Sequence, residues 1–261
     1  MEDVMVGKPQ ALRPTVRRAA IHEIIEKAGR ASVDALAERF DASTETVRRD
    51  LNALAKTGKV RKVHGGAVKV SITPEGLFEE RLAINAQAKQ EIAEKLAKMV
   101  EPGQSIMMDT GSTTLVCASA LARVRDLTVI TNSVRIAQTI DRARNGSRVI
   151  LLGGTYRTDN SQTVGAQTCS EIRRIRTDHV VLTVTGIDGS GAYDFSEHEA
   201  QIARSMVDNT GALTVVADSS KFGRNATFKV CSLERVDRLI LESNPHPDVK
   251  AALVAAGVAV I

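Results

Sequence analysis

The chain has 261 residues and a formal net charge of +4, and 43% of its residues are hydrophobic while 25% are charged. This composition is close to that of globular proteins and excludes an intrinsically disordered chain. Aromatic residues make up only 3% of the chain, which argues against binding single-stranded nucleic acid by base stacking, and no apolar run is long enough to span a membrane.

The first quarter of the chain carries the whole positive excess. Residues 1–70 contain 14 lysines and arginines against 9 acidic residues, whereas residues 71–261 contain 21 against 22. Basic charge gathered in a small module is typical of proteins that bind nucleic acid, although a solvated basic face has the same composition. Composition does not distinguish these two interpretations, so the sequence patterns along the chain have to do so.

Residues 14–68 predict three short helices and a β-hairpin. Pro14 suits a helix start and Gly29 a helix end, and Ser32 and Ser43 are the predicted N-caps of the second and third helices. Two short helices joined by a tight turn after a supporting helix predict a helix-turn-helix. A small helical module that contacts another protein is the alternative.

The third predicted helix carries polar and basic side chains on its first two turns, where a recognition helix contacts base edges. Its two consecutive arginines lie about 100° apart around the helix axis, so we expect one to contact a base and the other a phosphate. Asp50 is expected to cap the helix or to pair with Arg49 or a neighbour, and His64 either contacts phosphate or shapes the hairpin turn. The candidate DNA-binding residues are Ser43, Thr44, Glu45, Thr46, Arg48, Arg49, Arg61, Lys62 and His64.

The run Ser-Thr-Glu-Thr-Val-Arg-Arg-Asp-Leu-Asn-Ala-Leu (43–54), followed by Arg-Lys-Val-His-Gly-Gly-Ala (61–67), closely resembles the winged helix-turn-helix of the DeoR family of transcriptional regulators. The resemblance covers about residues 14–68 and implies binding to double-stranded operator DNA. We therefore expect residues 1–68 to form a DNA-binding domain.

Residues 69–80 contain Pro74 and Gly76 among few apolar positions and predict a linker to a second domain at residues 81–261. In that domain short apolar strands alternate with helices, which predicts an α/β fold with a parallel sheet covered on both faces. The predicted strands are 105–108, 127–130, 148–152, 179–184, 212–217, 237–241 and 257–261, and a helix is predicted over 85–100.

Polar and glycine-rich segments follow five of these strands, and ligands bind at the carboxyl ends of the strands in such sheets. Glycine and hydroxyl residues at a helix start offer donors to a phosphate, so we expect a ligand phosphate at residues 111–114, with Lys221 adding charge. Asp109, Asn132 and Asp188 are expected to face the hydroxyl groups of the ligand. The candidate effector-binding residues are Asp109, Gly111, Ser112, Thr113, Thr114, Thr131, Asn132, Ser133, Gly153, Gly154, Gly186, Asp188 and Lys221.

These segments are similar to the effector domain of the same family, which has a fold similar to ribose-5-phosphate isomerase, and the resemblance extends over about residues 78–245. Asp194-Phe195 before His198-Glu199, and the run 220–226, look like the branch of the family that regulates the use of glycerol 3-phosphate. The resemblance implies a repressor of carbohydrate or glycerol catabolism genes that a phosphorylated sugar or polyol releases from operator DNA. A homo-oligomer, either dimer or tetramer, is expected because one winged helix covers only a short half-site.

A sugar-phosphate isomerase is the main alternative function. Its carboxylate base would be one of Asp188, Asp194, Glu197 and Glu199, but these residues lie in or near one polar loop, where solvated carboxylates are common. An isomerase also has no use for an attached winged helix. We therefore expect no catalytic residues and no enzyme activity.

The three cysteines, Cys117, Cys169 and Cys231, form neither a disulfide framework nor a zinc pattern, and the histidines lack the spacing of metal ligands. We therefore expect no metal and no cofactor. The N-terminal residues lack the apolar segment of a secretory signal, so the expected location is the cytoplasm, without membrane contact.

Overall fold

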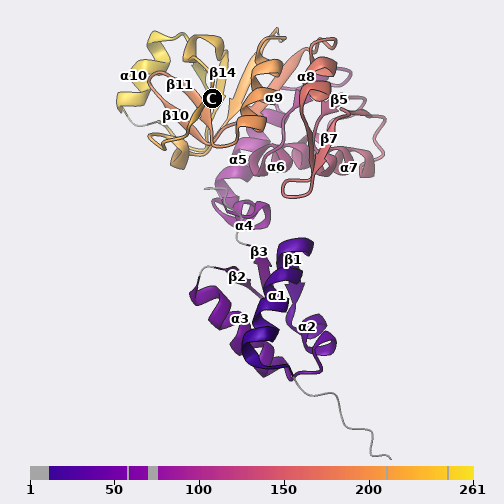
Figure 1. The fold of residues 1–261 in the computed structure, drawn as a ribbon. Helices are drawn as coiled ribbons and strands as arrows, with labels where there is room; N and C mark the ends of the chain where they lie inside the picture. The colour runs from indigo at the N-terminus through magenta and orange to yellow at the C-terminus, as the bar shows by residue number, and fades with distance from the viewer. Residues whose placement is uncertain (1–11, 58, 70–75, 210, 246) are drawn as a thin grey trace, which may run out of the picture. The chain divides into compact units, whose positions relative to one another are not determined.

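The chain forms two compact units, Met1–Ile72 and Thr73–Ile261 (Figure 1). The computed structural model describes residues 12–57, 59–69, 76–209, 211–245 and 247–261. Residues 70–75 of the predicted linker lie outside the described residues, and its last residues belong to the helix α4 (Phe78–Ala83), where Phe78 is buried. The domain boundaries expected from the sequence remain a prediction.

The first unit combines three helices with a small sheet. In chain order it contains α1 (Pro14–Ala28), β1 (Arg30–Ser32), α2 (Val33–Arg39), α3 (Thr44–Lys56), β2 (Val60–Val63) and β3 (Gly66–Lys69). Ser32 and Ser43 cap α2 and α3 as predicted, because their hydroxyls accept the backbone N–H of Ala35 at 3.2 Å and of Thr46 at 3.1 Å. Gly29 ends α1 in the left-handed conformation, with a φ of 77°.

The strand β1 was not predicted, since three residues are too few for a sequence pattern. It pairs antiparallel with β3, and the sheet order is β1-β3-β2. A Cβ added at Gly66 would lie 2.3 Å from the carbonyl oxygen of Ala31, so glycine at this position allows the two strands to approach. The hairpin of β2 and β3 is thereby fixed to the helical core, which contains Ile21, Ile25, Leu36, Val47 and Leu51.

The second unit is built around a seven-stranded parallel sheet (Figure 1). Its strands are β4 (Ser105–Met108), β5 (Thr128–Thr131), β6 (Arg148–Leu151), β9 (His179–Thr183), β12 (Leu213–Val216), β14 (Arg238–Ile240) and β15 (Ala259–Val260). Its longer helices are α5 (Ala86–Ala97), α6 (Ser112–Leu121), α7 (Val134–Arg142), α8 (Ala166–Ile172), α9 (Glu197–Val207) and α10 (Pro247–Ala255). Each of the seven predicted strands is present, with ends that differ by no more than about two residues from those expected.

The strand order places the carboxyl ends of β4 and β9 side by side. The order is β15-β14-β12-β9-β4-β5-β6, so from β4 the chain adds β5 and β6 on one side and then returns to add β9 and the later strands on the other. A sheet with this reversal has a topological switch point between the two strands, where the connections leave in opposite directions. Between β4 and β9 the fold therefore provides a crevice for a ligand.

The two faces of the sheet bury two separate hydrophobic cores. Ile106 and Met108 of β4 pack with residues of α5, α6 and α7, while Met107 packs with residues of α8, α9 and α10. The alternation follows from the period of two along a strand, and it confirms a parallel sheet covered on both faces.

Two smaller β elements were not predicted from the sequence. The hairpin of β7 (Thr155–Arg157) and β8 (Gln162–Val164) follows β6, and a three-stranded antiparallel sheet contains β10 (Gly186–Asp188), β11 (Gly191–Asp194) and β13 (Phe228–Cys231). These strands have three or four residues each, and glycine and aspartate in β10 and β11 disguise their pattern. Both elements supply residues near the crevice described below.

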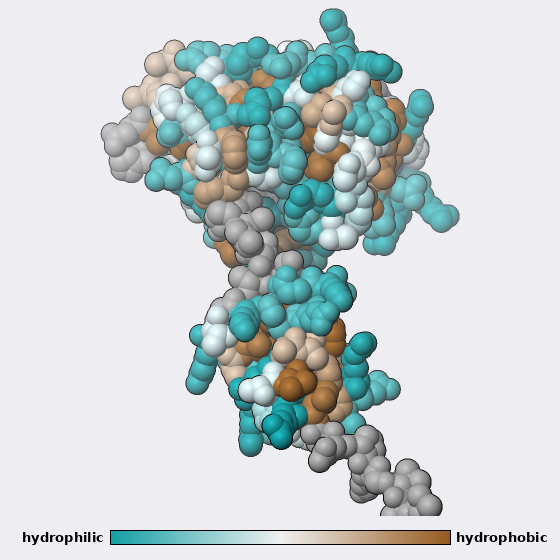
Figure 2. Space-filling model, viewed as in Figure 1, coloured by the Kyte–Doolittle hydropathy of each residue, from teal (hydrophilic) through white to brown (hydrophobic). Residues whose placement is uncertain are grey.

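The surface in the view of Figure 2 is mostly hydrophilic, with scattered hydrophobic residues. The two edge strands of the large sheet carry exposed apolar side chains, Leu151 on β6 and Val260 on β15. Within the described residues, no helix combines the length and the hydrophobicity needed to cross a membrane.

Candidate functional site

The outer face of α3 presents the predicted DNA-binding side chains to solvent. Thr44, Glu45, Arg48 and Arg49 are exposed, while Val47, Leu51 and Leu54 of the same helix are buried in the core of the unit. The helix is therefore amphipathic, with its apolar side in the core and its polar side facing solvent, as DNA recognition by a helix requires.

The basic residues of the hairpin do not all face the same way. Arg61 and Lys62 are neighbours on β2, so their side chains lie on opposite faces of the sheet. Arg61 is half-buried, whereas Lys62 and His64 are exposed. Lys62 and His64 are therefore the better placed of the three for contact with a DNA backbone.

Asp50 connects α3 to α1. Its carboxylate, 1% exposed, accepts the Nε–H of Arg17 at 2.6 Å and the Nε–H of Arg18 at 2.8 Å. The expected partner Arg49 instead lies 3.4 Å from Glu45 on the solvent side of the helix. Spacing along α3 could not reveal partners that are more than thirty residues away, and the two ion pairs fix α3 to α1.

In the second unit a cavity of about 110 Å³ lies at the crevice between β4 and β9. The residues that line it follow β4, β9 and β12, or come from α4, the start of α5 and the start of α9. They are Arg81, Ile84, Lys89, Thr110, Ser112, Thr113, Thr183, Val184, Thr185, Asp194, Glu199, Asp218, Ser220, Lys221 and Arg224.

The N-terminus of α6 opens into this cavity. Gly111 precedes the helix without a side-chain cap, and the first N–H groups of a helix have no partner within it, so they attract an anion. A Cβ added at Gly111 would lie 2.0 Å from Cγ2 of Thr183, so glycine is needed for β4 and β9 to lie this close. Ser112 and Thr113 line the cavity, while Thr114 is buried and donates its hydroxyl to the carbonyl oxygens of Asp109 and Gly111.

Four basic side chains line the cavity, namely Arg81, Lys89, Lys221 and Arg224. The Lys89 ammonium donates to the carbonyl oxygens of Arg81 and Ile84, which fixes the turn between α4 and α5. The Arg224 guanidinium lies over the ring of Phe195, 5.4 Å from its centre. Of the predicted effector-binding residues with a charge, only Lys221 lines the cavity.

Asp218 also lines the cavity, and its environment favours the ionised form. Burial alone would raise the pKa of Asp218, but hydrogen bonds from Ser220 and Asn85 and the charge of Lys221 together outweigh burial and hold the pKa below its usual value. The Asp218 carboxylate thus orders the short helix η1 (Ser219–Lys221) that carries Lys221.

Asp109 does not face the cavity, contrary to the prediction. Both oxygens of its carboxyl group accept the backbone N–H of Thr183, at 3.2 and 3.1 Å, so the residue joins β4 to β9 beneath the cavity. Burial, together with the nearby charges of Asp194 and Glu199, raises the pKa of Asp109 well above its usual value. Asp109 directly follows β4, and the contact with Thr183 holds its carboxyl group against the backbone of β9.

Asn132 and Asp188 are likewise absent from the cavity wall. Asn132 is buried, accepts the hydroxyl of Thr110 at 3.2 Å and donates to the carbonyl oxygen of Thr163 at 2.9 Å. Asp188 is exposed and accepts both the backbone N–H and the hydroxyl of Ser190. Neither side chain lines this cavity, and their expected contact with the hydroxyl groups of a ligand stays a prediction.

The remaining candidates do not line the cavity, and their contacts are with the chain around them. Thr131 accepts the N–H of Ser133, which in turn caps α7. Gly153 donates its N–H to Glu171, and Gly154 has a φ of 139°. A Cβ at Gly186 would lie 2.1 Å from the carbonyl oxygen of Arg224, so this glycine lets the chain before Arg224 pass close to β10.

Several lining residues were missed by the sequence argument. Thr185, Asp218, Ser220 and Arg224 lie within the polar segments already noted after β9 and β12, so a more generous selection would have included them. No sequence pattern marks Ile84 and Lys89 as site residues, because they reach the cavity only through the packing of α4 and α5.

No group of three or more His, Cys, Asp or Glu residues within the described parts of the chain is arranged to hold a metal ion. The three cysteines are buried, and burial raises the pKa of Cys231 to about 11.

Comparison with known proteins matches two family descriptions in succession. Residues 17–73 match "DeoR-like helix-turn-helix domain", and residues 84–243 match "DeoR C terminal sensor domain". The chain is 32% identical to the glycerol-3-phosphate regulon repressor of Escherichia coli K12, over 93% of this chain and 96% of that protein. It is 30% identical to the protein of the same name in Haemophilus influenzae, over 90% of this chain and 92% of that protein.

Among solved structures, ribose-5-phosphate isomerase A from Neisseria gonorrhoeae is 15% identical, with a TM-score of 0.37, and covers 51% of this chain and 52% of its own. A score this low supports no argument about the fold or the activity of this chain.

Proposed function

The chain belongs to the DeoR family of transcriptional regulators, and on this premise we propose that it is a repressor that leaves operator DNA when a phosphorylated polyol or sugar binds its second unit. The first unit contacts DNA, and the second unit senses the effector. The relatives named as repressors of the glycerol-3-phosphate regulon make glycerol 3-phosphate the first effector to test.

The contact with DNA is made by α3 and the hairpin. In this proposal α3 enters the major groove with Ser43, Thr44 and Thr46 near its leading end, and one of Arg48 and Arg49 contacts a base. Lys62 and His64 then contact the phosphate backbone, for which their exposure suits them.

The observation that carries the sensing function is the opening of the α6 N-terminus into a cavity at the switch point of the sheet. The N–H groups and hydroxyls of Ser112 and Thr113 would bind the phosphate, with the Lys221 ammonium adding opposite charge. The other end of the effector meets residues that differ from those first expected, since Asp109, Asn132 and Asp188 lie elsewhere.

Effector binding can release DNA only if the effector binds one arrangement of the protein more tightly than another. Arg81, Ile84 and Lys89 line the cavity from α4 and α5, the first helices after the predicted linker. We propose that movement of α4 on binding alters the linker and lowers the affinity for the operator.

We further propose a homo-oligomer that works in the cytoplasm with the DNA it regulates. Two copies would place two winged helices on successive half-sites, which affinities useful in a genome require. The exposed apolar side chains on both edge strands of the large sheet are consistent with contacts between copies. Sedimentation of the full chain at micromolar concentration tests this assembly, and a strict monomer with tight operator binding would contradict it.

The experiment for the whole proposal begins with DNA selected from random sequences by the full chain. Glycerol 3-phosphate added to the complex should release the selected DNA, whereas glycerol should not. Failure to select any sequence would refute the DNA-binding function, and release by neither glycerol 3-phosphate nor other phosphosugars would refute the sensing function. Aldose–ketose conversion of phosphosugars by the same preparation would instead favour an isomerase.

A further inference from the structure

Glu199 lines the cavity from the first turn of α9, and the start of this helix is held in place by a cap and by buried side chains. The Ser196 hydroxyl caps the helix by accepting the N–H of Glu199 at 3.3 Å. The following turns of α9 are anchored by Ala200, Ile202 and Met206, which are buried in one of the two cores.

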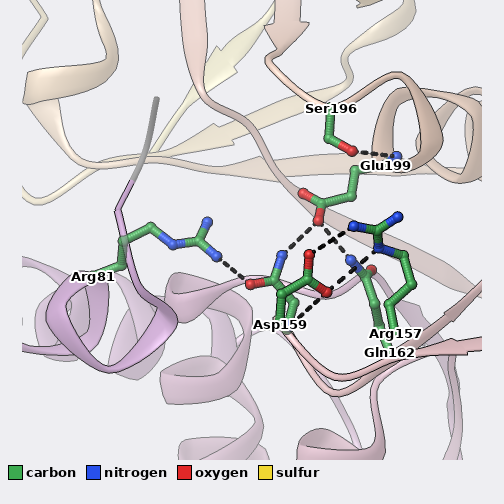
Figure 3. Close-up of polar contacts among 7 residues, drawn as sticks. Arg81, Arg157, Asp159, Gln162, Ser196 and Glu199 are labelled. Carbon is green, nitrogen blue, oxygen red and sulfur yellow. Dashed lines mark hydrogen bonds and ion pairs between the residues drawn. The ribbon is translucent and has the colours of Figure 1, made fainter. Parts of the chain in front are cut away.

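The direction of the Glu199 side chain departs from the usual behaviour of this sequence pattern. In a Ser-x-x-Glu capping box the glutamate accepts the N–H of the capping serine. Here the N–H of Ser196 donates to Asp194 at 2.8 Å, so Asp194 takes that role. The Glu199 carboxylate is turned instead toward the β7–β8 hairpin, as Figure 3 shows with Gln162 and Arg157.

Two amide side chains hold the carboxylate in this direction. The side-chain amides of Asn160 and Gln162 both donate to Oε1 of Glu199, each at 2.6 Å, and are only 8% and 1% exposed. The orientation of Asn160 is set from its other end, because its amide oxygen accepts the Arg81 guanidinium at 2.7 Å (Figure 3). Oε1 of Glu199 thus accepts two hydrogen bonds from fixed donors, an arrangement that is stronger with an ionised carboxylate than with a neutral carboxyl group.

The cavity consequently contains a fixed carboxylate in addition to its phosphate-attracting helix end. A carboxylate accepts hydrogen bonds from hydroxyl groups but repels a phosphate or a second carboxylate. Asp194 also lines the cavity, as a second acidic side chain besides Glu199. An anion bound at the start of α6 is thus accommodated best if its other end carries hydroxyls and no charge.

We propose that Glu199 is the specificity-determining residue of the cavity, which accepts hydrogen bonds from the hydroxyl groups of a phosphorylated polyol or sugar and rejects phosphorylated carboxylic acids. Asn160 and Gln162 are the positioning residues that hold it. The inference rests on the proposed sensing function, in which the phosphate binds at Ser112 and Thr113.

The test is calorimetric titration of the full chain with three probes: inorganic phosphate, glycerol 3-phosphate and 3-phosphoglycerate. Glu199→Gln should weaken binding of glycerol 3-phosphate by about 10-fold to 100-fold, as expected for the loss of a charged hydrogen bond, and leave inorganic phosphate within about twofold. The same variant should bind 3-phosphoglycerate more tightly than the wild type does. Glu197→Gln is the matched control, because Glu197 lies on the same turn but is exposed and outside the cavity wall.

A second variant keeps Glu199 but loosens it. Asn160→Ala should weaken the binding of glycerol 3-phosphate by a smaller factor, about 3-fold to 10-fold, without changing the binding of inorganic phosphate. This variant replaces Glu199→Gln in the test if Glu199→Gln does not fold. Equal affinity of the wild type and both variants for glycerol 3-phosphate overturns the inference while the sensing function stands. A wild type that binds neither phosphate nor glycerol 3-phosphate overturns the sensing function and the inference together.

Discussion

The two units of the molecule each bury an aspartate at a structural joint, but they do so with opposite electrostatics. Asp50 in the first unit accepts two arginine side chains from α1, so its negative charge is fully paired. Asp109 in the second unit is buried and lies near the charges of Asp194 and Glu199, and together these raise its pKa well above the usual value although it accepts the backbone N–H of Thr183. The contact made by Asp50 depends on an ionised carboxylate, whereas the surroundings of Asp109 favour the protonated carboxyl group.

This difference matches the ligand of each unit. The first unit presents basic and polar side chains on an exposed helix, which suits a large rigid polyanion that remains partly hydrated. The second unit encloses a small cavity with both basic and acidic side chains, which suits a small molecule with a charged end and a neutral end. A paired Asp50 holds α3 in place, while the raised pKa of Asp109 disfavours a further negative charge near the cavity.

The largest effect is expected from Asp50→Ala. The substitution leaves the largely buried guanidinium of Arg17 without its partner, which should destabilise the first unit by about 3–5 kcal/mol. Urea unfolding followed by far-ultraviolet circular dichroism measures the loss. Both tyrosines, Tyr156 and Tyr193, belong to the second unit, so tyrosine fluorescence reports that unit separately.

Glu45→Ala is the control for this experiment, because the exposed pair of Glu45 with Arg49 contributes no more than about 0.5 kcal/mol. A loss in Asp50→Ala no greater than that in Glu45→Ala would show that the buried pair does not hold α3 to α1.

Lys221→Ala should next raise the concentration of effector needed to release DNA, by roughly 10-fold to 100-fold, the value of one charged hydrogen bond. Affinity for the selected operator should not change, because Lys221 lies in the second unit. Operator binding followed by fluorescence anisotropy measures both quantities. Lys229→Ala is the matched control, since Lys229 is exposed on β13 and does not line the cavity; identical curves for the two variants would remove Lys221 from the site.

Arg48→Ala and Arg49→Ala should separate base contact from phosphate contact. Loss of the base contact should cost about 1–3 kcal/mol of binding free energy and relax specificity at one operator position. Loss of the phosphate contact should weaken all sequences alike and flatten the dependence on salt. Binding of selected and scrambled DNA over a series of salt concentrations distinguishes the two, and two variants that bind like the parent chain would exclude α3 as the recognition helix.

Features of each site that depend on residues close together in the sequence could be predicted, and those that depend on contacts between distant segments could not. The caps of α2 and α3, the exposed arginines and the glycine before α6 all follow from residues within a few positions of one another. Whether a side chain after a strand faces the cavity depends on register against a neighbouring strand, so the sequence could not show that Asp109 and Asn132 lie outside the cavity wall. Contacts such as Arg81 with Asn160 join segments 79 residues apart, and no local pattern encodes them.

Thr113→Val tests the phosphate end of the cavity with a smaller change. The variant keeps the shape and the backbone N–H but loses the hydroxyl, so the effector concentration for release should rise by only about 2-fold to 10-fold. Thr139→Val is a comparable substitution on α7, outside the cavity. A response of Thr113→Val equal to that of Thr139→Val would mean that the Thr113 hydroxyl does not bind the effector.

The smallest effect at acid pH is expected from Asp109→Asn. A neutral carboxyl and an amide accept the same N–H of Thr183, so the stability of the second unit should change by less than about 1 kcal/mol there. The pKa of Asp109 is raised on folding, so its contribution to stability is present at low pH and is lost as pH rises through the folded-state value. The variant should therefore become more stable than the wild type as pH rises, and a difference that does not vary with pH would contradict a neutral Asp109.

The central claim is that the second unit binds a phosphate ester at the start of α6. A crystal structure of the full chain with glycerol 3-phosphate tests it most directly. The account predicts the phosphate within hydrogen-bond distance of the N–H groups of Ser112 and Thr113, with the Lys221 ammonium beside it and the hydroxyl groups toward Glu199. A phosphate bound elsewhere in the chain, or the reverse orientation with the phosphate against Glu199, would contradict it.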